Sequence, residues 1–264
     1  MSELLPQPED SPQRLRMLGA RFDAALSTIA SALAQREGLP IPHHASSRTL
    51  EEMSLNRLQE KAGSGFIVLS SVSGGGKSTI GKMLEERGYV RLPRVTTRLT
   101  RPDEQHGHDY EFINREEFDT ALAHGEFAYH KDTYGEGRAI RRSAIEAARA
   151  PGARVYAEGD ALAYRDIQER LPEYKDLHYL SVFLLPPSFD EMVSRLSSRI
   201  DFHVAAGGAE DTLRKDQDER IASGIAYLEK AVLHVTSGTY DAFIANDDLE
   251  RVRGVIKTLT DAPS

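Results

Sequence analysis

The sequence predicts an α/β fold in which a parallel sheet is flanked by helices and preceded by a helical extension. From Gly65 onward, short apolar segments alternate with helical patterns, which is typical of parallel strands joined by crossover helices. The first 62 residues carry helical patterns instead. A glycine-rich segment that directly follows the first apolar segment adds a strand, loop and helix unit.

The composition is that of an ordinary globular chain. Of 264 residues, 40% are hydrophobic and 28% are charged. The 33 basic and 41 acidic residues give a net charge of -8, which argues against general affinity for nucleic acid or anionic membranes. Cysteine is absent, which excludes disulfides and thiolate metal sites. Because the sequence shows neither a signal peptide nor an apolar run of roughly 20 residues, we expect a cytoplasmic protein without a membrane partner.

Two helices are predicted in the extension. Apolar residues recur at spacings of three and four and form one stripe of a helix that ends near Gly38: Leu15, Leu18, Phe22, Leu26, Ile29 and Leu33. A second helix is expected to start at Thr49, where Thr49 and Glu52 have the spacing of a capping box. The stripe has two interpretations, because these helices can pack on the core or form a hairpin for a homodimer or another partner.

The rest of the chain predicts four strands and five helices around a polar insertion. The strands are expected at Phe66–Ser70, Ala153–Ala157, Tyr179–Leu185 and Ala242–Ala245. The helices are expected at Lys77–Arg87, Arg141–Arg149, Ser188–Arg199, Leu213–Val235 and Asp247–Leu259. The insertion covers about residues 94–138, between the first two strands, and insertions of that length inside an α/β core usually bind a ligand.

A phosphate-binding loop is indicated by the segment Ser71-Val72-Ser73-Gly74-Gly75-Gly76-Lys77-Ser78-Thr79. It matches G-x-x-x-x-G-K-[ST] except that Ser71 replaces the first glycine. Backbone N–H groups from Ser73 to Thr79 are expected to converge on ATP phosphates at the positive end of a helix. Lys77 would contact the β- and γ-phosphates, and the Ser78 hydroxyl would bind Mg²⁺. The alternative is a glycine-rich turn that binds nothing.

The insertion resembles the acceptor-binding segment of the guanylate kinase family. That segment reads T-T-R-x-x-R-x-x-E-x-x-G-x-D-Y-x-F, and residues 96–112 match it. The resemblance implies that Arg98 and Arg101 hold an acceptor monophosphate, that Glu104 orients the two arginines, and that Tyr110 donates its hydroxyl to the same phosphate. Planar guanidinium groups suit phosphate oxygens. The alternative is a basic turn exposed to solvent.

Later segments extend the resemblance over residues 65–260. It implies a P-loop kinase domain, residues 63–264, with inserted acceptor-binding and lid subdomains, whereas the extension, residues 1–62, has no counterpart. The lid would cover about residues 199–220 and supply Arg199 and Arg220, which with Lys77 would be catalytic. The resemblance also implies that Asn246 lies beside the adenine of ATP. It places three further residues beside the acceptor: Tyr134, Glu158 and Asp160.

The base-reading region departs from the family pattern. Tyr129 stands where guanylate kinases have a glutamate that accepts hydrogen bonds from guanine, and Glu136 replaces a serine or threonine. The hairpin that carries these residues is also shorter than in the family. Glu126, Asp132 or Glu136 could therefore accept hydrogen bonds from a different pattern of donors on the base of the acceptor. The lid contains Ala205-Ala206-Gly207-Gly208, which predicts a mobile cover.

The sequence thus predicts an ATP-dependent phosphotransferase with a phosphate-bearing acceptor and no covalent intermediate. The simplest acceptor is a nucleoside monophosphate, namely GMP, dGMP or a modified nucleotide. One alternative is a sugar-phosphate kinase of the ribose bisphosphate type. Another is a non-catalytic guanylate-kinase-like module that binds a phosphopeptide through the same arginines, although Lys77 and Ser78 argue against it.

Overall fold

A central parallel sheet organises the computed structural model, which describes residues 11–100, 104–133, 135–205 and 210–261. Within these residues, five parallel strands lie in the order β2-β7-β1-β8-β9. They are β1 (Phe66–Ser71), β2 (Val90–Arg91), β7 (Val155–Glu158), β8 (Leu180–Leu185) and β9 (Ala242–Ala245). The predicted α/β architecture is confirmed, although the sequence pattern did not indicate the two-residue strand β2.

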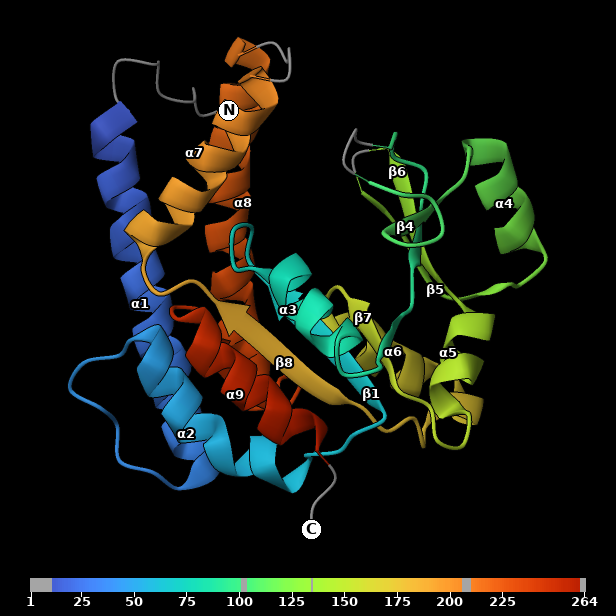
Figure 1. Cartoon of the computed structure of the whole chain (residues 1–264), viewed down its shortest axis with the longest axis horizontal. Coiled ribbons are helices and arrows are strands. Elements are labelled where there is room, and N and C mark those ends of the chain that lie inside the picture. Colours follow the sequence, from blue (N-terminus) through green and yellow to red (C-terminus); the bar gives the residue numbers. More distant parts are fainter. Residues whose placement is uncertain (1–10, 101–103, 134, 206–209, 262–264) are drawn as a thin grey trace.

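Helices cover both faces of this sheet (Figure 1). Because side chains of a strand alternate between faces, Phe66 and Val68 belong to one apolar cluster and Ile67 and Leu69 to another. The first cluster includes side chains of α1 (Ser11–Glu37), α6 (Ala161–Arg170) and α8 (Glu210–Val235). The second includes side chains of α3 (Lys77–Glu85) and α9 (Leu249–Thr260). Helix α6 was not predicted from the sequence.

The polar insertion folds as a second sheet with its own helix. Four strands of the described residues lie in the order β4-β3-β6-β5. They are β3 (Arg94–Thr96), β4 (Tyr110–Phe112), β5 (Phe127–Thr133) and β6 (Glu136–Arg141), and α4 (Arg115–Ala123) packs on one face. Phe118 of α4 is fully buried against Val95, Phe127 and Ala139. The insertion therefore extends to residue 141, slightly beyond the expected boundary.

The apolar stripe of α1 is buried within the chain. Phe22, Ile29 and Leu33 are inaccessible to solvent, and α1 packs against α8 and against α7 (Phe189–Ala205). The interpretation that the extension packs on the core therefore describes this structure. A homodimer through these helices stays a prediction, and it would need another surface of them.

Helix α2 (Ser47–Glu60) begins two residues earlier than expected. The prediction of a capping box at Thr49 and Glu52 was wrong, because Ser46 is the N-cap residue. The Ser46 hydroxyl accepts a hydrogen bond from the Thr49 N–H at 3.1 Å, and the Thr49 hydroxyl accepts one from the Ser46 N–H at 3.2 Å. A second hydroxyl residue at the third helical position thus replaces the usual glutamate.

Helix α2 also covers the exposed edge of the central sheet. Strand β9 lies at that edge, where unpaired N–H groups would otherwise face outward. The hydroxyl of Ser54 accepts a hydrogen bond from Phe243 N–H at 2.9 Å, and the carboxylate of Glu51 accepts one from Ala245 N–H at 2.7 Å. Side chains of the extension therefore complete the hydrogen bonding of the last strand.

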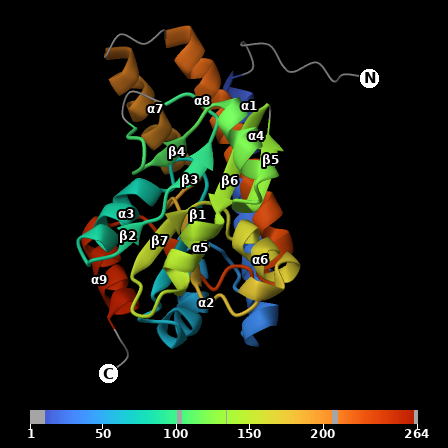
Figure 2. The same cartoon turned by 90° about the vertical axis from the view of Figure 1, so that its right-hand side faces the viewer.

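The insertion and the helices α7 and α8 extend beyond the same end of the central sheet, as both views show (Figures 1 and 2). The predicted lid is helical on both sides, in α7 and α8, whereas Ala206, Gly207 and Gly208 lie outside the described residues. Helix α5 (Arg142–Arg149) and the 3₁₀ turn η2 (Pro172–Tyr174) complete the elements. Among the described residues, no helix is both long and apolar enough to cross a membrane.

Replacing Ser54 with alanine tests the contact between α2 and β9. Ser54→Ala removes the acceptor of the buried Phe243 N–H, so we expect a loss of about 1–3 kcal/mol in the free energy of unfolding, measured by urea denaturation. Ser27→Ala is the matched control, because the Ser27 hydroxyl bonds only within α1, to the carbonyl of Asp23. Equal stability of the two variants would contradict the role of α2 at this edge.

Candidate functional site

The glycine-rich segment forms a tight loop between β1 and α3. Gly74 and Gly76 have φ angles of 78° and 94°, a left-handed conformation that favours glycine. Ser71, at the position of the missing first glycine, donates a hydrogen bond from its hydroxyl to Val72 O at 2.8 Å. A Cβ at Gly75 would collide with that hydroxyl. The loop therefore accommodates Ser71 because residue 75 is also glycine.

Lys77 begins α3 at the end of this loop. Its ammonium group donates a hydrogen bond to Ser71 O at 3.3 Å. Burial lowers the pKa of Lys77, and the negative charge of Glu158 partly opposes that shift. A cation held among few protein partners at a helix N-terminus is suited to bind an anion such as a phosphate group.

The side chain of Ser78 fits a magnesium ion bound together with phosphates. Ser78 and Thr79 are exposed in the first turn of α3. Within the described residues no group of three or more acidic or histidine side chains could hold a metal ion. Mg²⁺ commonly takes one or two protein oxygens and completes its shell with water and substrate phosphates. A single hydroxyl beside the phosphate loop is consistent with that mode of binding.

Asn246 connects the end of β9 to the phosphate loop. Its Nδ2 donates a hydrogen bond to Gly75 O at 3.1 Å, and a Cβ at Gly76 would collide with the same nitrogen. Its Oδ1 is buried without a hydrogen-bond partner. Arg195 of α7 donates to Asn246 O at 2.8 Å and to Gly74 O at 3.5 Å. Asn246 and Arg195 therefore hold three segments of the chain together around the loop.

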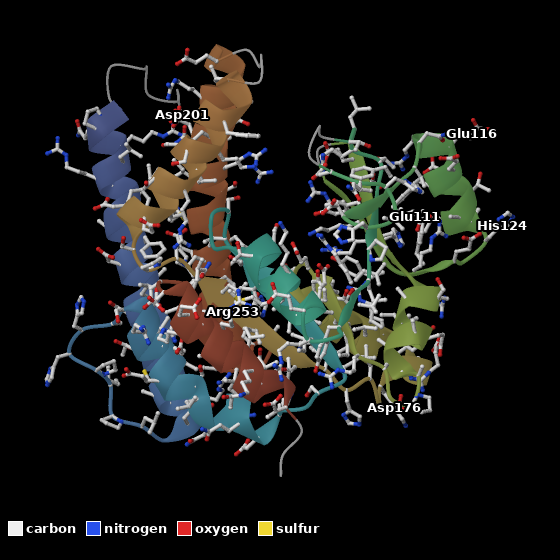
Figure 3. All side chains as sticks on the ribbon, in the orientation of Figure 1. Glu111, Glu116, His124, Asp176, Asp201 and Arg253 are labelled. Carbon is white, nitrogen blue, oxygen red and sulfur yellow. The ribbon has the colours of Figure 1, made fainter. Side chains whose placement is uncertain are left out.

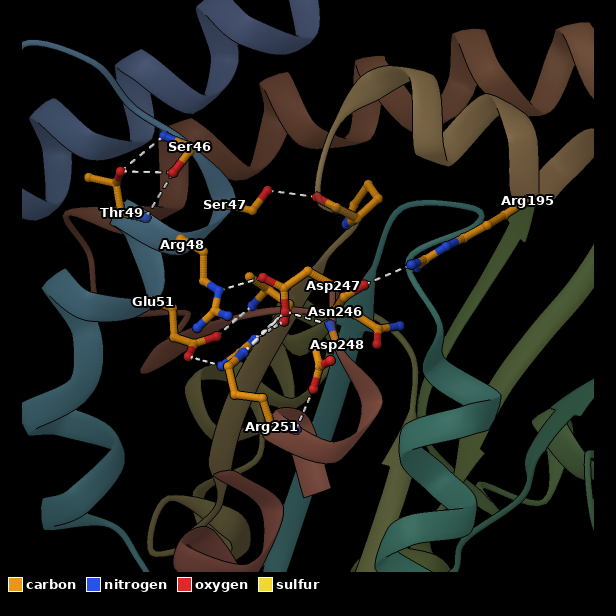
Figure 4. A network of polar contacts seen from close by, with 12 residues as sticks. Ser46, Ser47, Arg48, Thr49, Glu51, Arg195, Asn246, Asp247, Asp248 and Arg251 are labelled. Carbon is orange, nitrogen blue, oxygen red and sulfur yellow. Dashed lines mark hydrogen bonds and ion pairs between the residues drawn. The ribbon is translucent and has the colours of Figure 1, made fainter. Parts of the chain in front are cut away.

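The extension reaches this same place through α2 (Figure 4). Asp247, the residue after Asn246, forms ion pairs with Arg48 of α2 and with Arg251, the latter at 2.8 Å. Arg251 also pairs with Glu51. The turn that follows β9 is consequently fixed from one side by the phosphate loop and from the other by the extension.

Arg98 of the insertion forms the centre of a second basic site. Its Nη2 donates to both carboxylate oxygens of Glu104, at 2.8 and 2.9 Å, and its Nη1 donates to Leu99 O at 2.6 Å. The guanidinium carbon lies 5.5 Å from the ring centres of both Tyr110 and Phe112. The two hydrogen bonds to Glu104 thus fix the guanidinium of Arg98, whereas the role of Glu104 toward an acceptor stays a prediction. Arg101 lies outside the described residues.

Acidic residues lie at the carboxyl end of β7, where Glu158 is the last residue of the strand and Asp160 follows it. Glu158 pairs with Arg91 at 3.4 Å, and Arg91 also pairs with Asp109 of the insertion at 2.7 Å. Burial raises the pKa of Glu158, although the charges of Arg91 and Lys77 oppose the shift. Asp160 accepts a hydrogen bond from Leu162 N–H at 3.0 Å and caps α6. Arg91 therefore connects the insertion, through Asp109, to the end of β7, through Glu158.

The two arginines of the predicted lid lie on α7 and α8. Arg199 is exposed and follows Arg195 by one helical turn, so it shares the face of α7 that meets the loop. Arg220 is half-buried and lies one helical turn before Gly224. A Cβ added at Gly224 would lie 3.7 Å from the backbone nitrogen of Ser73. Both arginines therefore project from helix faces that contact the phosphate loop one turn away.

The base-reading positions lie on the hairpin of β5 and β6. Tyr129 is half-buried, and burial raises the pKa of its hydroxyl, which therefore stays neutral at physiological pH. Glu136 pairs with Arg138 at 3.1 Å. Glu126 and Asp132, the other candidates for a substitute acceptor, form ion pairs with Arg141 and Arg115. Tyr134 lies outside the described residues.

Several polar residues of this region were not identified from the sequence. Arg195 was not among the predicted site residues, although it contacts both Gly74 and Asn246. Arg91 and Arg94 flank Leu92-Pro93 just before the recognised motif, and this cluster of basic residues was an available signal. Lys131 had no such signal, because its neighbours are set by strand pairing.

Most of this chain is similar to proteins that are already known. A family model described as Guanylate kinase matches residues 64–262. The chain is 32% identical over 187 residues to a guanylate kinase of Vibrio parahaemolyticus, which covers 69% of this chain and 80% of the relative. It is 32% identical over 186 residues to that of Alkalilimnicola ehrlichii, with 70% and 81% covered. A crystal structure of guanylate kinase from Anaplasma phagocytophilum aligns with a TM-score of 0.49 and 24% identity, covering 74% of this chain and 86% of that one.

Substitution of Gly76 tests the packing of Asn246 on the loop. Gly76→Ala introduces a Cβ at a positive φ and into the Asn246 side chain, so we expect lower stability and at least about tenfold weaker binding of Mg-ATP by calorimetry. Gly88→Ala is the matched control, because Gly88 has a φ of 82° but no atom within 4 Å of the added Cβ. Wild-type affinity in Gly76→Ala would show that the loop tolerates displacement of Asn246.

Proposed function

The chain belongs to the guanylate kinase family, and on that premise we propose that it transfers the γ-phosphate of ATP to the phosphate group of a nucleoside monophosphate. GMP is the reference acceptor, because the relatives named above are guanylate kinases. The reaction needs no side-chain nucleophile, since positioning and neutralisation of charge supply most of the catalysis of phosphoryl transfer.

The observation that supports this proposal is that two cationic groups, Lys77 in the phosphate loop and Arg98 in the insertion, lie toward the same end of the central sheet (Figure 1). The phosphate loop with Lys77 would hold the β- and γ-phosphates of ATP, and Arg98 with Glu104 would hold the acceptor phosphate. The ion pairs of Arg91 with Glu158 and Asp109 join the two regions. A hydrolytic nucleotide switch would have no use for the second site.

Other residues take supporting roles in this proposal. Arg199 and Arg220 would neutralise charge on the transferring phosphate, and Asn246 would lie beside the adenine of ATP. Tyr110, Tyr129, Glu136 and Asp160 would line the acceptor side. Ser78 would hold Mg²⁺, which would offset the negative charge of the ATP phosphates.

The domain division is part of the same proposal. Residues 63–264 would form the kinase domain, which agrees with the family match at 64–262. Residues 1–62 would be an extension that supports the turn after β9 through Arg48 and Glu51. The cytoplasmic location and the homodimer expected from the sequence stay predictions.

Replacement of Arg98 separates the two phosphate sites. We expect Arg98→Ala to lower kcat/KM for the acceptor by at least about a hundredfold, because a charge-assisted contact with its phosphate is lost. ATP consumption with GMP, coupled to ADP detection, measures this change. Binding of Mg-ATP by calorimetry should change less than about twofold, because Arg98 contacts no part of the phosphate loop.

Arg115→Ala provides the control for a lost arginine on the insertion. Arg115 pairs with Asp119 and Asp132 on the side of α4, so its replacement should leave both measurements near wild type. If Arg98→Ala retained wild-type kcat/KM, the assignment of the acceptor phosphate would be wrong. If the wild-type protein bound Mg-ATP but consumed none with any monophosphate, a binding module would be favoured.

A further inference from the structure

The insertion sheet carries three cations on the face turned away from α4. Strand register places Lys131 of β5 directly opposite Arg138 of β6, and Arg138 opposite Thr96 of β3. Arg94 lies two residues before Thr96, so its side chain shares this face. Glu116 and His124 mark the two ends of α4, on the outer side of the insertion (Figure 3). The cationic face is therefore directed toward the core.

Two of these cations have no partner within the described part of the chain. Neither Arg94 nor Lys131 forms a hydrogen bond or an ion pair with any residue that the structure describes, and Nε of Arg94 is buried without a partner. Arg138 pairs with Glu136, yet its own Nε is also buried and unpartnered. Because buried polar groups are normally hydrogen-bonded, the unpartnered Nε atoms of Arg94 and Arg138 on a shared face indicate a place for a ligand.

The charges of this face reinforce one another. Partial burial lowers the pKa of Lys131, the positive charge of Arg94 lowers it further, and the negative charge of Asp160 opposes the shift. Like charges on neighbouring strands destabilise a sheet unless a counterion lies between them. Asp160 already caps α6 and accepts a hydrogen bond from Tyr240 at 3.4 Å. An anionic or oxygen-rich ligand would remove this repulsion.

The position of these cations relative to Arg98 points to the base of the acceptor. Arg94 pairs in register with Tyr110, whose ring contacts Arg98. The guanidinium of Arg94 extends from there to Gly159, where an added Cβ would collide with its Nη1. Arg94 thus lies between the proposed acceptor-phosphate site and the loop after β7, as a nucleotide extending from that site would require.

The chemistry of the cations selects among bases. Arginine and lysine only donate hydrogen bonds, so they can bind the O6 that guanine and xanthine share. At C2 they suit the oxo group of xanthine and not the 2-amino donor of guanine. Tyr129, which replaces a carboxylate, is a neutral hydroxyl whose pKa is raised by burial. We propose that Arg94 and Lys131 bind oxo or anionic oxygens of the acceptor's base, which makes xanthosine monophosphate a better acceptor than GMP.

This inference rests on the proposed function, and an acceptor panel tests both. ATP-dependent product formation is measured for the full chain with XMP, IMP, GMP and a ribose bisphosphate. We expect kcat/KM for XMP to exceed that for GMP by at least about tenfold. A preference for GMP, or turnover of the ribose bisphosphate above that of XMP, would overturn the inference. Turnover of none of the four would overturn the proposed function instead.

Two variants test the residues themselves. Arg94→Ala and Lys131→Met should each lower the ratio of kcat/KM for XMP to that for GMP by about tenfold to a hundredfold, since each removes a charged donor to the base. Lys131 is exposed, so its variant keeps the test valid if Arg94→Ala does not fold. Lys175→Met, at an exposed position beyond α6, should leave the ratio unchanged. Unchanged ratios in both site variants would contradict the assignment.

Discussion

Electrostatic repulsion between two phosphate groups is the constraint on which the rest of this structure depends. A phosphotransferase of this type must bring two polyanions into line, so it has to supply converging donors and cations from separate segments. The parallel sheet provides the common edge for these segments. The phosphate loop follows β1, Glu158 ends β7 with Asp160 two residues later, and Asn246 follows β9. Local structure at each strand end thus serves one electrostatic requirement.

The extension takes part in this arrangement through contacts at the end of the last strand. Glu51 and Ser54 satisfy backbone donors of β9, and Arg48 fixes Asp247 beside Asn246. Asn246 in turn contacts Gly75 of the loop. Helix α1 also packs on α7 and α8. The extension therefore contacts both the turn beside the phosphate loop and the helices that carry Arg199 and Arg220. It is therefore part of the folded kinase and not a separate appendage.

The features that could be predicted from the sequence are those that depend on residues close together along the chain. The phosphate loop could be recognised because its function requires glycine, lysine and serine at fixed spacing, and the Arg98–Glu104 contact spans only six residues. The contact of Ser54 with Phe243 spans 189 residues, and no local pattern indicates it. Likewise, Arg94 and Lys131 share a face only through pairing of β3, β6 and β5. The short strands of the insertion were missed because two of them contain three residues each.

Phosphoryl transfer between ATP and an acceptor phosphate requires that the two proposed phosphate sites act as one active site. Calorimetry with a bisubstrate analogue, adenosine joined through a pentaphosphate to guanosine or xanthosine, tests this most directly. We predict one analogue bound per chain, at least about a hundredfold tighter than ATP, because linked groups occupy both sites at the entropic cost of one association. Arg98→Ala should lose that gain. An analogue that binds no tighter than ATP to the wild-type protein would contradict the account.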